Sequence, residues 1–274
     1  MTLRRFRGLC CLLLVLLALP MQAVAQCMAK NTAFQAGEVL NYSLFFNWKF
    51  IWVNAGTASM TINDSKWEGR DVFRCHLMTT TSKRLDRFFM MRDTLLSVVT
   101  PDLQPVYYKK GANEGGKYYL DQVWYSRSGG KTKLKQSYKN AYGNVTERAF
   151  ESADCVYDML SMMLRARSFD ASVFKKGDKL RFLMADGDDV DNITLIYRGR
   201  ENFTMRSSGV TYRCLVFSFV EYEDKKEKEI ITFYISDDYN HIPVRLDLFL
   251  RFGTAKAYLD SYKGLRHECT SIVK

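Results

Sequence analysis

The sequence has few residues that could form a local metal or redox site. Only three His are present, and no two of them are close enough in the sequence to be neighbouring metal ligands on one strand or helix. A C-x-x-C motif is also missing, which excludes the common redox motif and the usual zinc-binding spacing. We therefore expect no metal ion and no other cofactor.

Motifs of catalytic nucleophiles and of phosphate binding are missing as well. No G-x-S-x-G sequence occurs, and GGKT at 129–132 lacks the Gly that a phosphate-binding loop needs at the position of Tyr125. Cys75 and His76 are adjacent, but neighbours in a strand point to opposite faces, so a nucleophile pair is not favoured. We assign no catalytic residue, and a hydrolase is the least favoured class.

Long apolar runs are absent after the N-terminus. The run over 9–19 is about half of the roughly 20 residues that a membrane-spanning helix needs. Three Arg precede it, and Ala23 and Ala25 follow with A-x-A spacing. This arrangement predicts a secretory signal peptide over 1–25, and therefore an exported protein, periplasmic or associated with the outer membrane, without a transmembrane span.

The charge of the chain is positive but dispersed. Removing residues 1–25 lowers the formal net charge from +10 to +7, and the basic residues alternate with acidic ones. Because an exported chain without a recognition motif has little reason to bind nucleic acid, we expect no such partner. The oligomeric state cannot be read from these features.

Five Cys remain after removal of the signal peptide, so at least one is unpaired. Export permits disulfides, and two pairings compete. Cys27 and Cys269 flank the two ends of the folded body, whereas Cys75 and Cys214 occupy equivalent positions in an internal repeat. Either pairing, or no disulfide at all, is compatible with the sequence.

Strand signals dominate the mature chain. Apolar and polar residues alternate from Leu40 to Trp48, and similar short runs follow, separated by Asn, Asp, Ser and Gly. The acidic run at 186–192 is read as a solvated hairpin tip rather than a Ca²⁺ site, because it lacks the ordered spacing of a calcium loop. The further strands are expected at 57–62, 72–80, 94–99, 106–110, 118–126, 180–184, 193–198, 212–222, 230–236, 244–250 and 255–262.

The second half of the chain resembles the first at an offset of about 140 residues. FQAGEVLNY from Phe34 aligns with FKKGDKLRF from Phe174. Further along, Cys75 aligns with Cys214, Pro105 with Pro243, and Lys117 with Lys256, in the same order. Four anchors at a nearly constant offset predict a duplicated β-rich unit.

One stretch between the two halves predicts a helix. Val156, Met159, Leu160, Met163 and Leu164 recur with helical spacing and define one apolar stripe. Ser152 or Asp154 is the expected N-cap, and Arg165 and Arg167 fall in the expected last turn. We expect the helix at about 154–167.

The chain also resembles a known group of proteins. The F-x-x-G-E-x-L-x-Y opening, NWKFIWVNAGTASM, YDMLSMMLRAR and the late IPV are similar to an uncharacterised domain-of-unknown-function family of exported Gram-negative envelope proteins. The resemblance implies export and a β-rich fold. It implies no catalytic residue, because these motifs are structural in character.

These observations predict one β-rich domain over 26–274. It is mainly β and antiparallel, with related units at about 34–150 and 171–263 that form one curved sheet or incomplete barrel. The central amphipathic helix is expected against the concave side, where its apolar stripe is buried.

Aromatic and Met clusters are the remaining clue to function. The clusters around 46–52 and 88–90 hold more apolar side chains than one face of a strand can bury. They either belong to a core on both faces of the sheet or line the mouth of a binding site. We expect a non-enzymatic binding or carrier module for an apolar or amphiphilic envelope ligand; the alternative is an interaction module for an envelope protein. The candidate ligand-binding residues are Phe46, Trp48, Phe50, Trp52, Phe88, Phe89 and Met90.

Overall fold

The described chain is built mostly from β-strands. A computed structural model describes residues 27–48, 51–223, 226–250 and 253–273, so the predicted signal peptide lies outside the described residues. In this part of the chain there is one α-helix, α3 (Met159–Ala166), with two 3-10 turns, η1 (Leu85–Arg87) and η2 (Ala171–Val173). The strands are β1 (Glu38–Trp48), β2 (Ile51–Trp67), β3 (Arg70–Thr81), β4 (Met91–Val99), β5 (Pro105–Glu114), β6 (Lys117–Ser128), β7 (Lys131–Lys139), β8 (Val145–Ser152), β9 (Val156–Tyr157), β10 (Lys179–Asp186), β11 (Asp189–Thr204), β12 (Thr211–Glu223), β13 (Lys226–Ser236), β14 (Pro243–Leu250), β15 (Gly253–Lys263) and β16 (Ile272–Val273).

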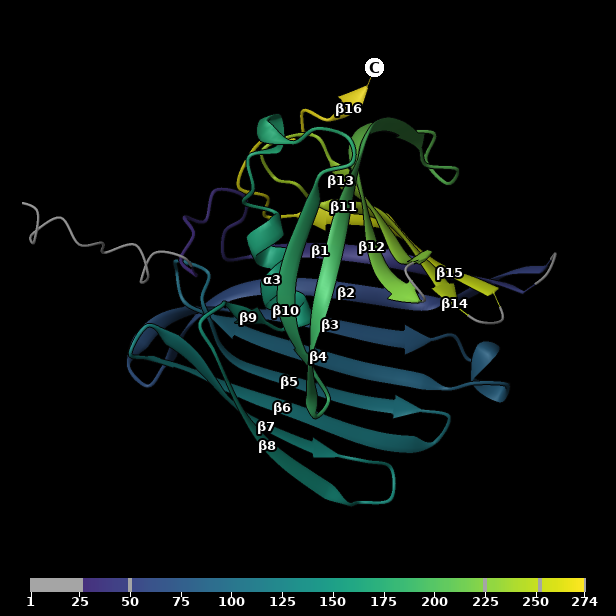
Figure 1. Cartoon of the computed structure of the whole chain (residues 1–274). Coiled ribbons are helices and arrows are strands. Elements are labelled where there is room, and N and C mark those ends of the chain that lie inside the picture. Colours follow the sequence, from purple (N-terminus) through teal and green to yellow (C-terminus); the bar gives the residue numbers. More distant parts are fainter. Residues whose placement is uncertain (1–26, 49–50, 224–225, 251–252, 274) are drawn as a thin grey trace, which may run out of the picture.

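All strands join one sheet with a simple order. The order is β8-β7-β6-β5-β4-β3-β2-β1-β15-β14-β13-β12-β11-β10-β9, with β16 paired to β12. Only β9 and β10 pair in parallel among the described strands. The sheet curls into a nearly closed, barrel-like body with one unsealed seam, and β8 and β9 are the two ends of the order (Figure 1). The predicted antiparallel, incomplete barrel is confirmed.

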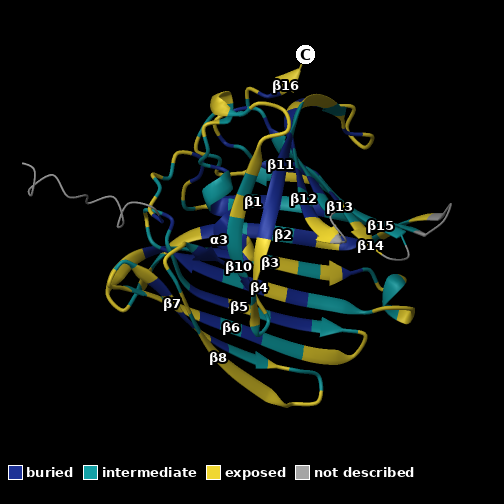
Figure 2. Ribbon diagram, viewed as in Figure 1, coloured by how far each residue is buried: buried dark blue, intermediate teal, exposed yellow. Residues whose placement is uncertain are grey.

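The concave side of the sheet holds the core. Inward and outward side chains alternate along the strands, as in β7, where Thr132, Leu134 and Gln136 are buried between exposed Lys residues (Figure 2). Buried residues from both halves, including Leu40 and Val244, belong to one cluster with residues of α3. The helix contacts β4, β9 and β10, so it lies inside the curl of the sheet, as predicted.

The two runs of strands, β1 to β6 and β10 to β15, have the same order. Each run is an antiparallel meander in which every strand pairs with the next along the chain. A Gly with positive φ precedes each run, Gly37 at 90° and Gly177 at 99°. The Gly37 amide donates to Ile62 O in β2, and the Gly177 amide donates to Tyr197 O in β11, both at 2.8 Å.

A second pair of equivalent turns precedes β5 and β14. Leu103 and His241 have φ values of 62° and 45°, which is unusual for residues other than Gly. Each lies two residues before the Pro that begins the following strand, Pro105 or Pro243. The two halves thus share strand order and turn geometry.

The helix is shorter than predicted and begins later. Its expected range was 154–167, with Ser152 or Asp154 as N-cap, but α3 begins at Met159. These caps are wrong because β8 continues to Ser152 and the chain then forms β9. Asp158 is the N-cap instead.

Asp158 caps the helix from a fully buried position. Its Oδ1 accepts from the amides of Leu160 at 3.1 Å and Ser161 at 2.9 Å. The Ser161 hydroxyl in turn accepts from the Asp158 amide at 3.0 Å, which completes a capping box. Ser97 of β4 donates to the other carboxylate oxygen at 3.0 Å, so the cap also joins the helix to the sheet.

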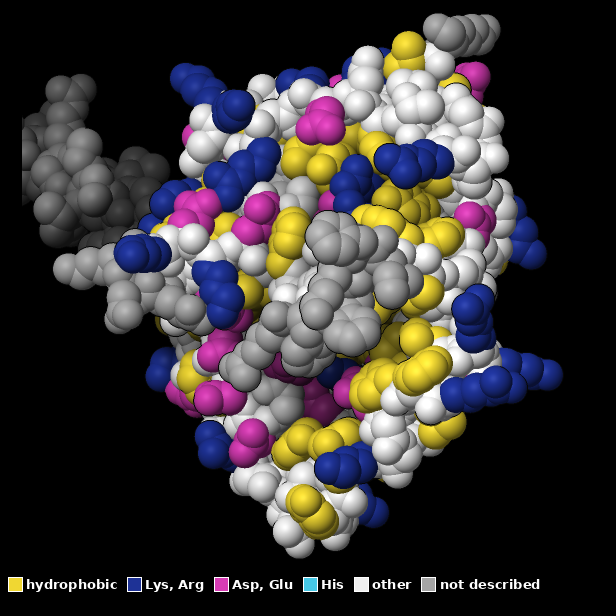
Figure 3. All heavy atoms as spheres, turned by 90° about the vertical axis from the view of Figure 1, so that its right-hand side faces the viewer, with side chains coloured by type: hydrophobic (Ala, Val, Ile, Leu, Met, Phe, Trp, Pro, Cys, Tyr) yellow, Lys and Arg dark blue, Asp and Glu magenta, His cyan; other side chains and the backbone are white. Residues whose placement is uncertain are grey.

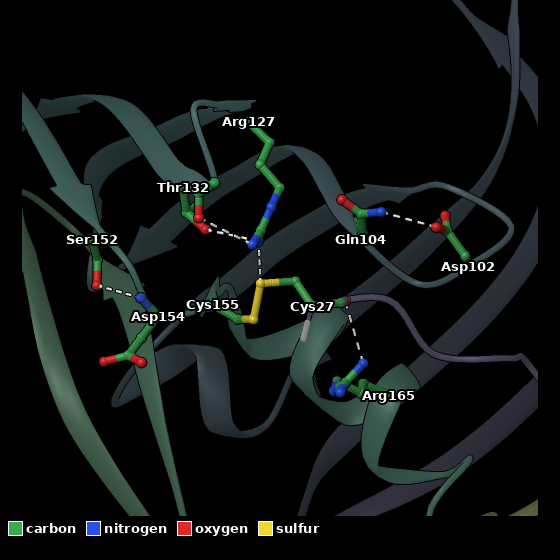
Figure 4. Close-up of a disulfide and its surroundings, with 10 residues drawn as sticks. Cys27, Asp102, Gln104, Arg127, Thr132, Ser152, Asp154, Cys155 and Arg165 are labelled. Atoms are coloured by element: carbon green, nitrogen blue, oxygen red, sulfur yellow. Dashed lines mark hydrogen bonds between the residues drawn. A yellow bond between two sulfur atoms is a disulfide. The ribbon is translucent and has the colours of Figure 1, made fainter. Parts of the chain in front are cut away.

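The predicted Cys pairings are both wrong. The disulfide joins Cys27 to Cys155, whose Cα atoms lie 5.4 Å apart, and Cys75, Cys214 and Cys269 are free (Figure 4). Cys155 lies in the short connection between β8 and β9, where the start of the described chain packs. Cys75 and Cys214 are buried in β3 and β12, which β2, β1, β15, β14 and β13 separate in the sheet.

Removing the disulfide should lower the stability of the domain substantially. The bond closes a loop with a sequence separation of 128 residues, which restricts the unfolded chain. We expect Cys155→Ser with Cys27→Ser to reduce the free energy of unfolding by about 2–4 kcal/mol, measured by urea denaturation. Cys269→Ser is the matched control, because Cys269 is free and half-buried. Equal stability of the double variant and the control would contradict this prediction.

Candidate binding site at the open end

Several hairpin turns lie at one end of the curled sheet, which we call the open end. Because successive strands run in opposite directions, the connections β1–β2, β3–β4, β5–β6 and β14–β15 all lie at the same end, on the right of Figure 1. Large apolar side chains are exposed beside these turns. We call this group the apolar rim; it consists of Trp52, Phe88, Phe89, Phe249 and Leu250, with exposed fractions from 42% to 85%.

The most exposed member, Phe88, belongs to a fixed turn. Phe88 and Phe89 both donate their amides to Leu85 O, at 2.8 Å and 2.9 Å, in the 3-10 turn η1. The base of this loop is tied to β2, where the Ser82 amide donates to Ala55 O at 2.8 Å. The rings are therefore held at the surface by backbone hydrogen bonds and not by burial.

Charged and backbone contacts hold the other side of the same loop. Asp86 accepts from Arg92 at 2.5 Å and from the Thr81 hydroxyl at 2.5 Å. These hydrogen bonds keep the pKa of the Asp86 carboxyl below its usual value. The Gly115 amide of the β5–β6 turn donates to Met90 O at 2.8 Å, which places the loop against the neighbouring hairpin.

The predicted ligand-binding residues divide by their exposure. Trp52, Phe88 and Phe89 are exposed, and Phe46 and Met90 are half-buried. Trp48 is the last residue of β1, and Phe50 lies outside the described residues. The structure brings the exposed three to one end of the sheet, which fits a mouth better than a core; that they bind a ligand stays a prediction.

A small polar cavity opens at the same end. Its volume is about 210 Å³, and side chains from β5, β6, β7 and the β10–β11 turn line it. In Figure 3 acidic side chains are visible in a hollow below the centre of this face, and hydrophobic side chains lie to the right of it and below it. The polar and charged lining residues are Lys110, Glu114, Tyr119, Asp121, Tyr138 and Asp186.

Asp121 is the most deeply buried acid of this cavity, with an exposed fraction of 3%. One carboxylate oxygen, Oδ2, accepts from the Gly187 amide at 3.0 Å. The other, Oδ1, is buried and has no hydrogen-bond partner in the described structure. The pKa of Asp121 is raised to about 7, mainly by burial and in part by the charge of Asp186.

The acidic loop at 186–192 forms the hairpin tip that the sequence predicts, between β10 and β11, and the side chains of Asp186, Asp189 and Asp191 are exposed. Gln136 of β7 is buried and donates to Asp189 O at 2.9 Å and to Gly187 O at 3.3 Å. Together with the bond to Asp121, these contacts dock the β10–β11 turn onto the concave face of β6 and β7. The hairpin tip is thus confirmed, and the structure adds that an inward-facing amide and an inward-facing carboxylate both bind its backbone.

Asp93 of β4 adds a further acid near the cavity. Its Oδ1 is also buried without a partner, and its exposed fraction is 9%. Burial, followed by the nearby charge of Glu114, raises the pKa of Asp93 to about 6. The interior at the open end is thus polar and rich in carboxylates.

A second depression lies near the first described residues. It is shallow and open, has a volume of about 670 Å³, and is lined by Met28, Lys30, Phe73, Pro101 and Asp102 among others. Its lining mixes apolar and charged side chains without an unpaired buried group. We therefore place the candidate site at the open end.

Two classes of site are not supported in the described part of the chain. No group of three or more His, Cys, Asp or Glu is arranged there to hold a metal ion. No described helix has the length and apolar character needed to cross a bilayer.

The fold defines a β-barrel-like domain, and comparisons with known proteins identify its family. The chain belongs to the family described as "Protein of unknown function (DUF3108)", which matches residues 41–260. The expectation of an uncharacterised family is confirmed. No curated protein matches the chain.

A solved structure of low sequence identity shares this fold. It is a crystal structure of a beta-barrel-like protein of the domain of unknown function DUF1849 from Brucella abortus, with a TM-score of 0.53 and 10% identity. The match covers 84% of this chain and 99% of that one. At this identity the likeness concerns the fold alone.

Proposed function

We propose that this protein is an exported binding module that holds an amphiphilic molecule of the cell envelope at its open end. The observation that carries the proposal is the position of the apolar rim beside a small polar cavity. Exposed aromatic side chains in a group often mark a contact surface for a ligand or a partner. A molecule with an apolar chain and a polar group fits this pair of surfaces.

The packing of the interior favours binding at the mouth over enclosure of a whole lipid chain. Leu160 and Leu164 of α3 are buried against the sheet and occupy its concave side. The cavity of about 210 Å³ is smaller than the roughly 300 Å³ at which pockets for drug-sized ligands begin. It can therefore take the polar group, while the apolar part would lie on the rim.

Export is part of the proposal. It is supported by the leader pattern at 1–25 and by the disulfide between Cys27 and Cys155, since disulfides persist mainly in oxidising compartments. The location in the periplasm or at the outer membrane is likewise proposed. An envelope protein with an exposed apolar segment is the alternative occupant of the rim.

The rim can be tested with a quenching probe. A terminally brominated long-chain alcohol should quench the fluorescence of Trp52, and a Trp52→Phe variant identifies this contribution. We expect Phe88→Ser with Phe89→Ser to weaken binding by about tenfold or more, because two apolar contact surfaces are removed. Phe88 is 85% exposed, so its loss should leave the fold intact.

Tyr239→Ser is the matched control for this experiment. Tyr239 is 78% exposed and lies in the β13–β14 connection, at the other end of the strands. The affinity of the Tyr239→Ser variant for the probe should equal that of the wild-type protein. Absence of quenching, or equal loss in the control, would refute binding at the rim; capture of an apolar peptide in place of the alcohol would favour the interaction module.

A further inference from the structure

We infer that the polar cavity binds a primary ammonium group at the carboxylate of Asp121, with Asp186 and Glu114 adding negative charge to the site. The inference rests on the proposed function, because this group would be the polar end of the amphiphile whose apolar part lies on the rim. It adds the chemical class of that polar end, which the rim alone does not define.

The first support is the unpaired oxygen of Asp121. A buried carboxylate oxygen without a donor is costly, so native structures nearly always supply one. Oδ2 already has the Gly187 amide at 3.0 Å, whereas Oδ1 has no partner in the described structure. Because Asp121 lines the cavity, a ligand in the cavity can supply the missing donor.

The second support is the charge of the lining. Three carboxylates, those of Glu114, Asp121 and Asp186, face a single basic side chain, Lys110. No salt bridge within 4.0 Å joins Lys110 to any of them among the described residues. The excess of negative charge in a partly enclosed space favours a cationic occupant.

The size of the cavity and the aromatic rings that line it favour an organic ammonium over a metal ion. Calcium takes roughly 6–8 oxygen ligands. Among the described residues no group of acids is arranged to hold a metal ion. A primary ammonium does not need such a group, because one carboxylate can accept a hydrogen bond from it and offset its charge. Tyr119 and Tyr138 also line the cavity, and their rings can contact a cation face-on.

Charged groups from several elements act on Asp121 and set a pH dependence. Its pKa is about 7: burial raises it most, Asp186 of β10 and Asp158 at the start of α3 contribute to the rise, and the Gly187 amide and Lys110 of β5 oppose it. An alkylammonium stays protonated over this range, so its affinity should follow ionisation of Asp121. Tyr138 of β7 and Glu114 of β5 also line the cavity. Burial raises the pKa of the Tyr138 hydroxyl above its usual value, which is already well above neutral pH.

Calorimetry with octylammonium, octyltrimethylammonium and octanol tests the inference. Octylammonium should bind more tightly than the other two, because only it combines charge with N–H donors. Asp121→Asn keeps an acceptor for the Gly187 amide but removes the charge, and it should weaken octylammonium about tenfold or more without changing octanol. Between about pH 6 and about pH 8 the wild-type affinity should rise by up to about tenfold, and that of Asp121→Asn should rise less, because position 121 no longer titrates while Asp93 beside Glu114 still does so near pH 6.

Asp71→Asn is the control, since Asp71 is an exposed carboxylate in a surface ion pair with Lys66. Equal binding of octanol and octylammonium, or no effect of Asp121→Asn, would overturn the inference while leaving the rim proposal standing. Calcium binding in place of the ammonium would also overturn it.

Propylammonium separates the two proposals, because it has almost no apolar part. In NMR spectra it should shift the Gly187 amide of the wild type but not that of Asp121→Asn. This result would support the ammonium site even if no long-chain probe bound the rim. Absence of the shift at saturating propylammonium would refute the site.

Discussion

Replacing Arg167 with Met should lower the free energy of unfolding by about 3–5 kcal/mol, because it leaves a buried carboxylate without its partner. Arg167 is 2% exposed and Glu38 is fully buried. The two side chains form a bidentate pair, with Nη1 at 2.6 Å from Oε1 and Nη2 at 2.9 Å from Oε2. Such parallel hydrogen bonds depend on the planar guanidinium and cannot be made by Met.

The same guanidinium also forms hydrogen bonds with the second half of the chain. Nε and Nη2 of Arg167 donate to Asn240 O at 3.1 Å and 3.0 Å. The His241 ring contacts Arg167 O through Nδ1 at 2.6 Å. Arg167 thus connects the end of α3, the first residue of β1 and the turn before β14, and its loss affects all three.

Urea denaturation of Arg167→Met and of a surface control measures this effect. Lys66→Met removes an exposed pair with Asp71, which should change stability by less than about 1 kcal/mol. In the double variant Glu38→Gln with Arg167→Met, part of the loss should be recovered, because no buried charge remains. Equal stability of Arg167→Met and Lys66→Met would show that the buried pair does not contribute.

The strands were predictable where apolar residues alternate strongly. Leu40, Tyr42 and Leu44 mark β1, and the run over 212–222 falls within β12. β7 and β8 were missed as strands. In β7 the inward positions hold Thr132, Leu134 and Gln136, so two of three inward side chains are polar and the alternation in hydrophobicity is weak.

Long-range pairing was not predictable from local patterns. The sequence indicates which residues are apolar or charged, but not which strands curl over one another. Arg167 was expected to act on the helix dipole in the last turn, whereas it binds Glu38 across the barrel. Cys155 was not considered as a partner of Cys27, because their contact depends on where the start of the described chain packs.

The candidate site shows the same limit. Asp121 occurs in KYYLD, which aligns with KAYLD ending at Asp260, yet Asp121 is buried and Asp260 is exposed. The repeat therefore could not distinguish them. One usable signal is the alternation Tyr119, Asp121, Val123, Tyr125, which places a carboxylate on the inward face of β6.

Replacing Leu160 with Asp should destabilise the domain by about 4–5 kcal/mol, the second of the two largest effects. Leu160 is 2% exposed and packs in the main core cluster. Truncating a buried Leu costs about 2–5 kcal/mol, and a buried charge adds to this loss. If Leu160→Asp does not fold, Leu160→Ala should still show a loss of about 2–4 kcal/mol.

Met159→Asp is the matched control, although the apolar spacing of the sequence predicts the same damage for both positions. Met159 is 39% exposed and begins α3, where an acidic side chain is favourable to the helix dipole. We expect a change within about 1 kcal/mol for Met159→Asp. Thermal melts and urea curves of the two variants should therefore differ widely; similar curves would mean that the stripe is not buried as the structure shows.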